Sequence, residues 1–290
     1  MRLPVYASIG LCILAVSEAA MFAHIPPFWS WHTPFAWTGY ILFVDGCVFS
    51  RRGSSWLTTS RREFAFLACV SIPLWLVFEG YNLLIHNWHY INLPQVLILR
   101  YLGYAWAFAT IWPGIFETAE LVAVLRRSGA SGEGRGANTR VTAVTPTPRR
   151  LSFAPDGIYV LAGAAMLIWP FLWPSPYLSI PVWLGFIVLL DPLNARAGDE
   201  SLIRDWRNSR RDRLVNLVVA GFACGFLWEF WNYWSLTKWI YTVPYLPNLK
   251  LFEMPVLGFF GFPAFALECF TMYVAVRRIF WHGPSRAIGL

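Results

Sequence analysis

The chain has 290 residues, of which 57% are hydrophobic and only 13% are charged, and its mean hydropathy is +0.48. Soluble domains hold about 45–50% apolar and about 25% charged residues, so the composition excludes a soluble globular protein and indicates an integral membrane protein. The net charge of +7 does not indicate a nucleic-acid partner, because the basic residues gather in the connections between apolar runs.

Eight apolar stretches are long enough, or nearly so, to cross a hydrocarbon core, which takes about 20 helical residues. They begin near residues 5, 34, 64, 97, 155, 176, 212 and 252. The predicted fold is therefore all-α and integral to the membrane, with eight transmembrane helices. The first stretch resembles a secretory signal. The second half of the chain has an equivalent stretch, from Ile158 to Trp173, that cannot be a signal, so we expect the first helix to be retained.

The second half of the chain repeats landmarks of the first half in the same order. The matched sets are Trp37, Gly39, Tyr40 and Asp45 with Trp183, Gly185, Phe186 and Asp191; Glu79 and Asn82 with Glu229 and Asn232; Trp88 and Tyr90 with Trp239 and Tyr241; and Gly103, Pro113 and Glu117 with Gly258, Pro263 and Glu268. We predict two tandem four-helix repeats in the same orientation, residues 1–127 and 151–290. A flexible cytoplasmic linker is expected at 128–150, which is rich in Gly, Ser, Thr, Arg and Pro. Paired membrane repeats usually place their working site at the interface between the copies.

The basic residues set the expected orientation. With the N-terminus inside, only Arg100, Lys238 and Lys250 of the 23 lysines and arginines fall on the outer side. Because cytoplasmic loops carry an excess of Lys and Arg, we predict that both termini are cytoplasmic. The predicted location is the cell inner (cytoplasmic) membrane, which the chain crosses several times.

Acidic and amide side chains interrupt the apolar runs, where a central acidic residue costs about 2.5–3.5 kcal/mol on insertion scales. They are Glu18, Glu79, Asn82, Glu117, Glu120, Glu229, Asn232 and Glu268. In each half a Glu and an Asn stand three residues apart, on one helical face. Two interpretations stay open, a functional site or hydrogen bonds that only tie helices together. Asp45 and Asp191 lie beside arginine-rich loops, where we expect surface ion pairs.

Neither a metal nor a cofactor is predicted. The five cysteines show no metal-type spacing, and the phosphate-loop, dinucleotide and Gly-x-Ser-x-Gly patterns are absent. His86 and His89 have the i, i+3 spacing of a helical metal pair. The second half has no matching histidines, so we do not expect these two to bind a metal.

A series of motifs recurs in both halves. In the first half they are Phe78-Glu79, Trp88-His89-Tyr90, Leu102-Gly103, Pro113 and Glu117, and in the second they are Trp228-Glu229, Trp239-Ile240-Tyr241, Leu257-Gly258, Pro263 and Glu268. Over residues 34–125 and 176–280 the chain resembles the membrane-embedded lycopene cyclase family, the type made of two small helical modules, separate or fused in tandem. It departs from the Pro-x-Glu-Glu motif of that family, since Glu117 stands four residues after Pro113 and Glu268 five after Pro263.

The resemblance implies acid-catalysed cyclisation of a carotenoid-like polyene between the two repeats, an isomerisation without a cofactor. An acid protonates a terminal double bond, and aromatic faces or a carboxylate stabilise the cation that results. The candidate catalytic acids are Glu79, Glu117, Glu229 and Glu268. The candidate substrate-binding residues are Asn82, Asn232, Trp88, Tyr90, Trp239, Tyr241, Trp112 and Trp231, with Trp75, Trp106, Trp228 and Trp234 as further wall residues.

Two functions of other classes stay open. A small proton-coupled transporter or lipid-moving protein would use the two Glu-Asn faces as its proton path. A non-catalytic membrane scaffold would use the same groups only as interhelical hydrogen bonds. The expected partners are the bilayer and a long isoprenoid or other lipid, with no nucleic acid.

Overall fold

The computed structural model describes residues 3–130 and 153–290. In the first half of the chain the elements are α1 (Val5–Phe22), α2 (His32–Arg52), α3 (Trp56–Thr59), α4 (Arg61–Ile85), β1 (Trp88–Ile91), α5 (Leu97–Ala109) and α6 (Ile111–Ala130). In the second half they are α7 (Phe153–Leu172), η1 (Pro176–Leu178), α8 (Ser179–Arg196), α9 (Leu202–Arg207), α10 (Asp212–Trp234), β2 (Lys238–Tyr241), β3 (Lys250–Leu251), β4 (Met254–Pro255), η2 (Val256–Phe260) and α11 (Gly261–Phe280).

Most of the chain is helical, and six helical segments among the described residues are long and apolar enough to cross a membrane. These six are α1, α4, the α5–α6 segment, the η1–α8 segment, α10 and the η2–α11 segment. The predicted spans near residues 34 and 155 are also helices, α2 and α7, but neither is among the six. In α2, Asp45, Arg51 and Arg52 reduce the apolar character, and the described apolar part of α7, Asp156–Leu172, is short.

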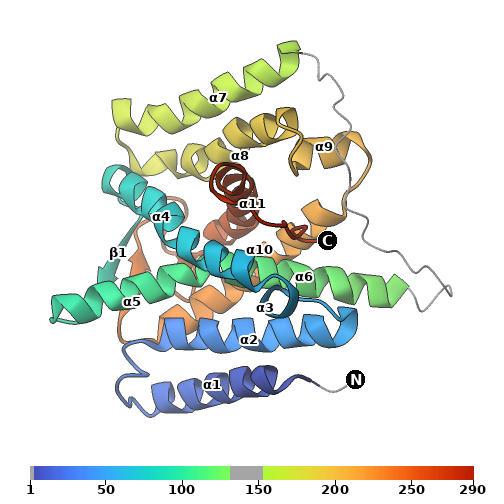
Figure 1. Ribbon diagram of the computed structural model, residues 1–290. Coiled ribbons are helices and arrows are strands. Elements are labelled where there is room, and N and C mark those ends of the chain that lie inside the picture. The colour runs from blue at the N-terminus through green and yellow to red at the C-terminus, as the bar shows by residue number, and fades with distance from the viewer. Residues whose placement is uncertain (1–2, 131–152) are drawn as a thin grey trace.

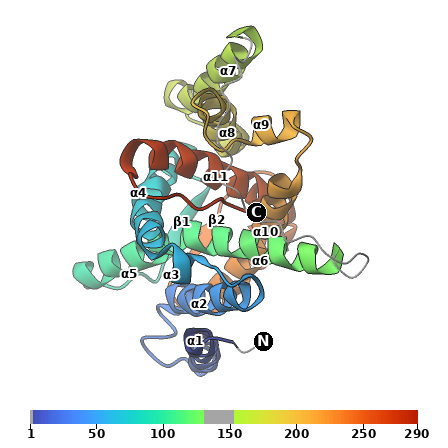
Figure 2. The same cartoon turned by 45° about the vertical axis from the view of Figure 1, so that its right-hand side comes forward.

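The helices form layers, with α1 outermost on one side and α7 outermost on the opposite side (Figures 1 and 2). Between them, α2 packs against α1 and α8 packs against α7, and α4, α6, α10 and α11 fill the centre. The apolar core runs through this central group and includes residues from both halves of the chain.

Close backbone approach joins α1 to α2. A Cβ atom on Gly39 would lie 2.7 Å from the carbonyl oxygen of Gly10, and one on Gly10 would lie 2.6 Å from that of Gly39. In the same way, a Cβ on Gly163 of α7 would lie 2.4 Å from the backbone nitrogen of Leu189 in α8. Small residues permit this packing in membrane helices, where apolar burial gives little drive for association.

Two segment boundaries differ from the sequence predictions. Helix α6 continues to Ala130, so the predicted linker at 128–150 begins inside a helix, and its residues 131–150 lie outside the described residues. The last span, predicted to begin near 252, begins at Val256, because residues 250–255 form the antiparallel pair β3–β4.

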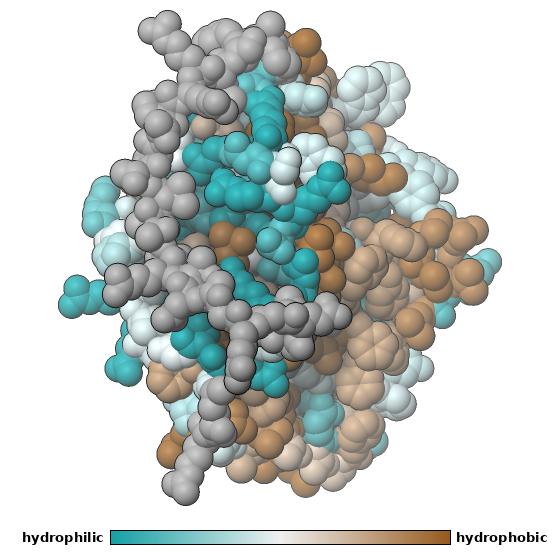
Figure 3. Space-filling view, turned by 90° about the vertical axis from the view of Figure 1, so that its right-hand side faces the viewer, coloured by the Kyte–Doolittle hydropathy of each residue, from teal (hydrophilic) through white to brown (hydrophobic). Residues whose placement is uncertain are grey.

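Charged side chains gather at the end of the molecule where the described chain begins and ends (Figures 1 and 3). There Glu120 of α6 binds both Arg52 and Arg286, and Arg277 bridges Glu63 and Glu200. These ion pairs are buried or nearly so. They join helices of both halves to the segment that follows α11.

The prediction of surface ion pairs at Asp45 and Asp191 is wrong. Both side chains are buried, at 0% and 3% exposure. Asp45 accepts hydrogen bonds from the Ser55 hydroxyl and the Leu57 backbone N–H, just before and within α3. Asp191 accepts bonds from the Ser201 hydroxyl and from two backbone N–H groups in the first turn of α9. Asp45 therefore satisfies one free N–H group, and Asp191 two, at the start of a short helix, where no intrahelical carbonyl can reach them.

Candidate functional site

The strands β1 and β2 pair antiparallel and join the two halves of the chain. Trp88 lies opposite Tyr241, and Tyr90 lies opposite Trp239. Aromatic side chains suit strands. Because alternate residues of a strand point to one face and directly opposed residues share that face, the four aromatic side chains form a single surface. We call this pair of strands the aromatic ribbon.

An asparagine amide fixes each strand of the aromatic ribbon to the helix that precedes it. Asn82 donates to the Trp88 carbonyl at 2.8 Å and accepts from the Trp88 N–H at 3.2 Å. Asn232 forms the same pair of bonds with Trp239, at 2.9 and 3.0 Å. The two predicted substrate-binding asparagines thus hold the ribbon in place, and neither lines the cavity described next.

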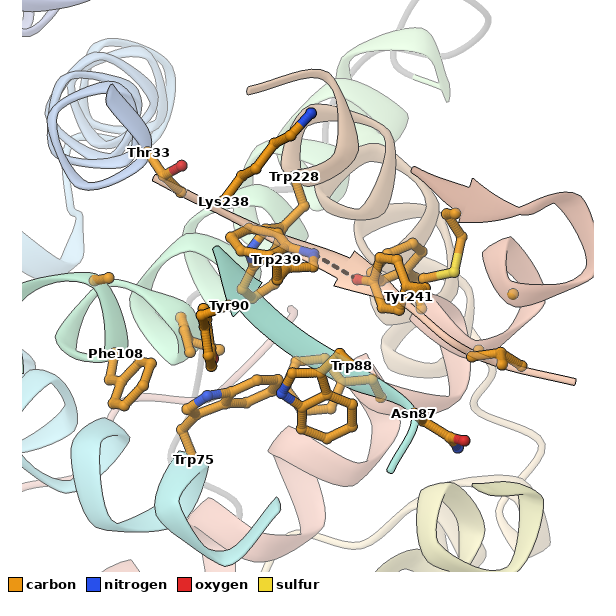
Figure 4. Close-up of a pocket in the computed structure, with 18 of the residues that line it drawn as sticks. Thr33, Trp75, Asn87, Trp88, Tyr90, Phe108, Trp228, Lys238, Trp239 and Tyr241 are labelled. Atoms are coloured by element: carbon orange, nitrogen blue, oxygen red, sulfur yellow. Dashed lines mark hydrogen bonds between the residues drawn. The ribbon is translucent and has the colours of Figure 1, made fainter. Parts of the chain in front are cut away.

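A cavity of about 450 Å³ lies against the aromatic ribbon, within the usual range of small-molecule sites. Figure 4 shows the ribbon residues beside Trp75, Phe108 and Trp228 around it. The aromatic lining comprises Trp31, Trp37, Trp75, Trp88, Tyr90, Tyr104, Phe108, Trp183, Trp228, Trp239, Tyr241, Tyr245, Phe260, Phe262 and Phe265. Among the described residues only Arg100 and Lys238 bring a formal charge to this wall.

The Glu79 carboxyl stands behind the wall on the first-half side. Its Oε1 accepts hydrogen bonds from the Tyr90 hydroxyl at 2.5 Å, from Trp75 Nε1 at 2.9 Å and from Trp88 Nε1 at 3.2 Å. All three donors line the cavity. Glu79 therefore orients three aromatic side chains and places a negative or hydrogen-bonding group directly behind them.

Glu229 takes the corresponding place on the second-half side, with a different hydrogen-bond pattern. Its Oε1 accepts from the Tyr241 hydroxyl at 2.9 Å, and the Tyr241 oxygen in turn accepts from Trp239 Nε1 at 2.9 Å. Glu229 is fully buried, and its Oε2 has no hydrogen-bond partner in the part of the chain described. The Tyr241 hydroxyl therefore links Glu229 to the cavity wall by a hydrogen bond.

The hydroxyl groups of the two ribbon tyrosines, Tyr90 and Tyr241, have raised pKa values. Burial, reinforced by the neighbouring Glu229 carboxylate, raises the pKa of Tyr241 well above its usual value of 10.0. Burial and the Glu79 carboxylate act on the pKa of Tyr90 in the same direction. At neutral pH both phenols are thus protonated, and they donate their protons to the carboxyls behind the wall.

The other two predicted acids lie away from the cavity. Glu117 in α6 is fully buried, and among the described residues no N–H or O–H group donates to either of its carboxyl oxygens. The Asp45 carboxyl is a neighbouring acid whose negative charge acts on Glu117. Glu268 in α11 accepts a bond from the Phe186 backbone N–H at 3.2 Å. Among the described residues, Glu79 and Glu229 accept hydrogen bonds from residues of the cavity wall, and Glu117 and Glu268 do not.

Some of the predicted tryptophans line the cavity and others do not. Trp75, Trp88, Trp228 and Trp239 line the cavity. Those outside it are Trp112, which donates to the Cys269 carbonyl at 2.9 Å; Trp231, which donates to Glu18 at 2.7 Å; Trp106, which donates to Thr38 at 3.0 Å; and Trp234, which is 42% exposed. Two lining residues that sequence reasoning did not assign to the site, Trp37 and Trp183, are a matched pair in the two halves. The internal match was the signal that would have found them.

The two histidines considered for a metal do not share a helical face. His86 is the C-cap residue that follows α4 and has a positive φ of 52°, and His89 lies in β1. Both are exposed. Across residues 3–130 and 153–290, no three side chains of the metal-binding types His, Cys, Asp and Glu come together as a candidate ligand set.

Comparison of the chain with protein-family models, with curated proteins and with solved structures found no match. The function must therefore be argued from the cavity itself. Its chemistry combines apolar aromatic walls, two hydroxyl donors and two carboxyls placed behind those donors.

Proposed function

We propose that the chain is built of two tandem four-helix repeats in the same orientation, and that the cavity between them binds and modifies one end of a long isoprenoid or carotenoid-like lipid. The register of the aromatic ribbon supports the repeats. Trp88 meets Tyr241 just as Trp239 meets Tyr90, the reciprocal pairing of a two-fold interface. The matching bonds of Asn82 and Asn232 to the backbone are a second, independent correspondence.

The character of the cavity wall supports the lipid class. Tryptophan, tyrosine and phenylalanine rings form most of the lining, and the volume of about 450 Å³ suits the end of a long molecule better than its whole length. A polyene end has flat, polarisable double bonds that stack on such rings. Its remaining chain would extend toward the bilayer.

The proposed reaction is an acid-catalysed isomerisation that needs no cofactor. In the structure the Tyr241 hydroxyl donates to Glu229 Oε1. Protonation of Glu229 would reverse this bond, so that Glu229 donates to the Tyr241 oxygen while the Tyr241 hydroxyl proton passes to a terminal carbon–carbon double bond, which leaves a carbocation on the lipid. Ring closure moves the charge, and loss of a proton from a neighbouring carbon restores a double bond and returns the proton to the enzyme. Atoms and charge therefore balance without an oxidant or reductant.

The aromatic faces and Glu79 would stabilise the cation. Trp75 and Trp88 stand with their ring centroids 5.9 Å apart beside Glu79, and both rings line the cavity. A cation over an indole face gains about 2 kcal/mol or more when water is excluded. Glu79, held by three donors, adds a fixed counter-charge behind those rings.

The proposed location is the cell inner membrane, with both termini in the cytoplasm. Figure 1 shows the aromatic ribbon on the opposite side of the molecule from the chain ends, where the charged side chains gather. The cavity and the arginine-rich end therefore lie on opposite sides. The positive-inside rule then directs the cavity away from the cytoplasm.

The test expresses the chain in bacteria that accumulate lycopene and analyses the pigments by chromatography. We expect the wild type to convert the polyene, and Glu229→Gln to lower the rate about 10²- to 10⁴-fold, the usual contribution of a general acid. Glu18→Gln is the matched control, because Glu18 is another acid within an apolar helix and its Gln form still accepts from Trp231. A wild type that leaves lycopene unchanged, and purifies without any polyene or quinone, refutes the proposal.

A proton-coupled lipid transporter is the second candidate function. The observation that favours it is the buried Glu117 with the neighbouring Asp45 carboxyl, because an intramembrane acid pair away from the cavity suits a proton path. Proton-driven lipid uptake into proteoliposomes that is lost in Glu117→Gln and kept in Glu229→Gln selects this function. The opposite pattern selects the acid-catalysed reaction.

A further inference from the structure

Arg100 is an unusual residue for its position. It lies in the first turn of α5, and its neighbours Leu97, Ile98 and Tyr101 are 58%, 67% and 64% exposed, as expected for side chains that face acyl chains. Arg100 itself is half-buried and lines the cavity. An arginine within an apolar membrane segment is costly and marks a functional site by default.

The protein leaves most of the Arg100 guanidinium free. Its Nε donates to the Pro94 carbonyl at 3.0 Å, and among the described residues no carboxylate lies within ion-pair distance of its two terminal nitrogens. The other basic residue of the wall, Lys238, is neutralised by Glu253 at 2.6 Å. The described part of the cavity wall thus holds one cation without an acidic partner.

From the Arg100 guanidinium at this apolar wall we infer that the cavity favours an amphiphile, an isoprenoid chain that carries an oxyanion headgroup, and that Arg100 binds the headgroup. This inference rests on the proposed binding of a lipid end in the cavity, and adds that a phosphorylated or carboxylated isoprenoid binds there more tightly than a neutral one. The planar guanidinium presents two parallel N–H donors that match phosphate or carboxylate oxygens. The apolar rings of the cavity wall then receive the chain.

The competing account is that Arg100 reaches the headgroup of an ordinary bilayer lipid and leaves the cavity to a neutral ligand. Long basic side chains near helix ends do extend to the interface in this way. The two accounts differ in one measurable respect, since only a cavity ligand with its own oxyanion makes the affinity of the probe depend on both the headgroup and Arg100.

The experiment titrates two probes into the purified full-length chain in phosphatidylcholine nanodiscs and follows quenching of tryptophan fluorescence. The probes are geranylgeranyl phosphate and the neutral geranylgeraniol. We expect the phosphate to bind about 10- to 100-fold more tightly, the range of charge-assisted hydrogen bonds. Arg100→Gln should remove this difference and leave the affinity for geranylgeraniol unchanged, which also shows that the variant cavity is intact.

Lys250→Gln is the matched control, a basic residue at the same end that does not line the cavity and should keep the wild-type preference. Equal affinities of the wild type for the two probes, or a preference that persists in Arg100→Gln, overturn the inference and favour the bilayer headgroup account. Failure of both probes to quench the wild type instead counts against the proposed function.

Discussion

Replacement of Asp191 by alanine tests whether this aspartate caps a helix or forms a surface ion pair. Its carboxylate accepts from the Leu202 N–H at 2.8 Å, the Ile203 N–H at 2.7 Å and the Ser201 hydroxyl at 3.0 Å. Alanine leaves two backbone N–H groups of α9 without an acceptor. A buried donor left unpaired costs about 1–3 kcal/mol, and loss of a cap about 1 kcal/mol, so we expect a loss of about 3 kcal/mol in the free energy of unfolding.

The assay measures SDS-induced unfolding in mixed micelles, with Asp212→Ala as the control. Asp212 is a surface residue whose Oδ1 lies 3.2 Å from Nη2 of Arg126, and its side chain is 69% exposed. Exposed ion pairs contribute about 0–1 kcal/mol and are screened by salt. We therefore expect a small cost for Asp212→Ala that shrinks in about 1 M NaCl, and a large cost for Asp191→Ala that does not change with salt.

A cost below about 1 kcal/mol for Asp191→Ala, or one that disappears in high salt, refutes the cap and restores the surface ion pair. Asp191→Asn separates shape from charge, because the amide oxygen still accepts one of the two backbone bonds. We expect it to be intermediate between the wild type and the alanine variant.

Three further outcomes follow from close contacts and hydrogen bonds. Gly163→Ala forces a Cβ to 2.4 Å from the α8 backbone and should lower the free energy of unfolding by about 1–3 kcal/mol in the same unfolding assay. The control is Gly80→Ala in α4, whose Cβ meets nothing within 4 Å and which should raise the free energy of unfolding by about 0.5–1 kcal/mol. Tyr241→Phe removes the hydroxyl that donates to Glu229 and accepts from Trp239 Nε1. It should cost about 1–3 kcal/mol in that assay and abolish polyene conversion. Because the pKa of Tyr241 in the folded chain is above 10.0, its contribution to stability is complete below pH 10 and should be lost progressively as the pH rises from 10 toward the folded pKa, as thermal unfolding scans over pH would show.

The helical framework was predictable because a membrane helix requires a long uninterrupted apolar run. The predicted starts near 5, 97 and 212 coincide with Val5, Leu97 and Asp212. The aromatic ribbon was not predicted, because strands of four residues are shorter than any periodicity signal and their tryptophans read equally well as interfacial anchors. Strand pairing between segments about 150 residues apart depends on tertiary contacts that no local pattern contains.

The site was predictable where two copies of a residue could be compared. Glu79 and Glu229 were found through the internal match, and they do contact the cavity wall. Asp45 was misread for a physical reason. The sequence shows the arginines beside it, but its hydrogen-bond partners are the Ser55 hydroxyl and a backbone N–H of α3, whose position depends on how the chain turns after α2.

The cavity combines a near-symmetric wall with two unlike carboxyls. Trp88, Tyr90 and their counterparts face one another in reciprocal register, yet Glu79 is half-exposed and holds three donors on one oxygen, whereas Glu229 is fully buried and holds one. Two identical acids would repel each other as carboxylates and compete for the same proton. Unlike surroundings separate their roles, because three donors meet one oxygen of Glu79 whereas Glu229 accepts a single donor, the Tyr241 hydroxyl. A single chain should therefore bind one lipid end in one direction, with a stoichiometry of one probe per chain in the nanodisc titration.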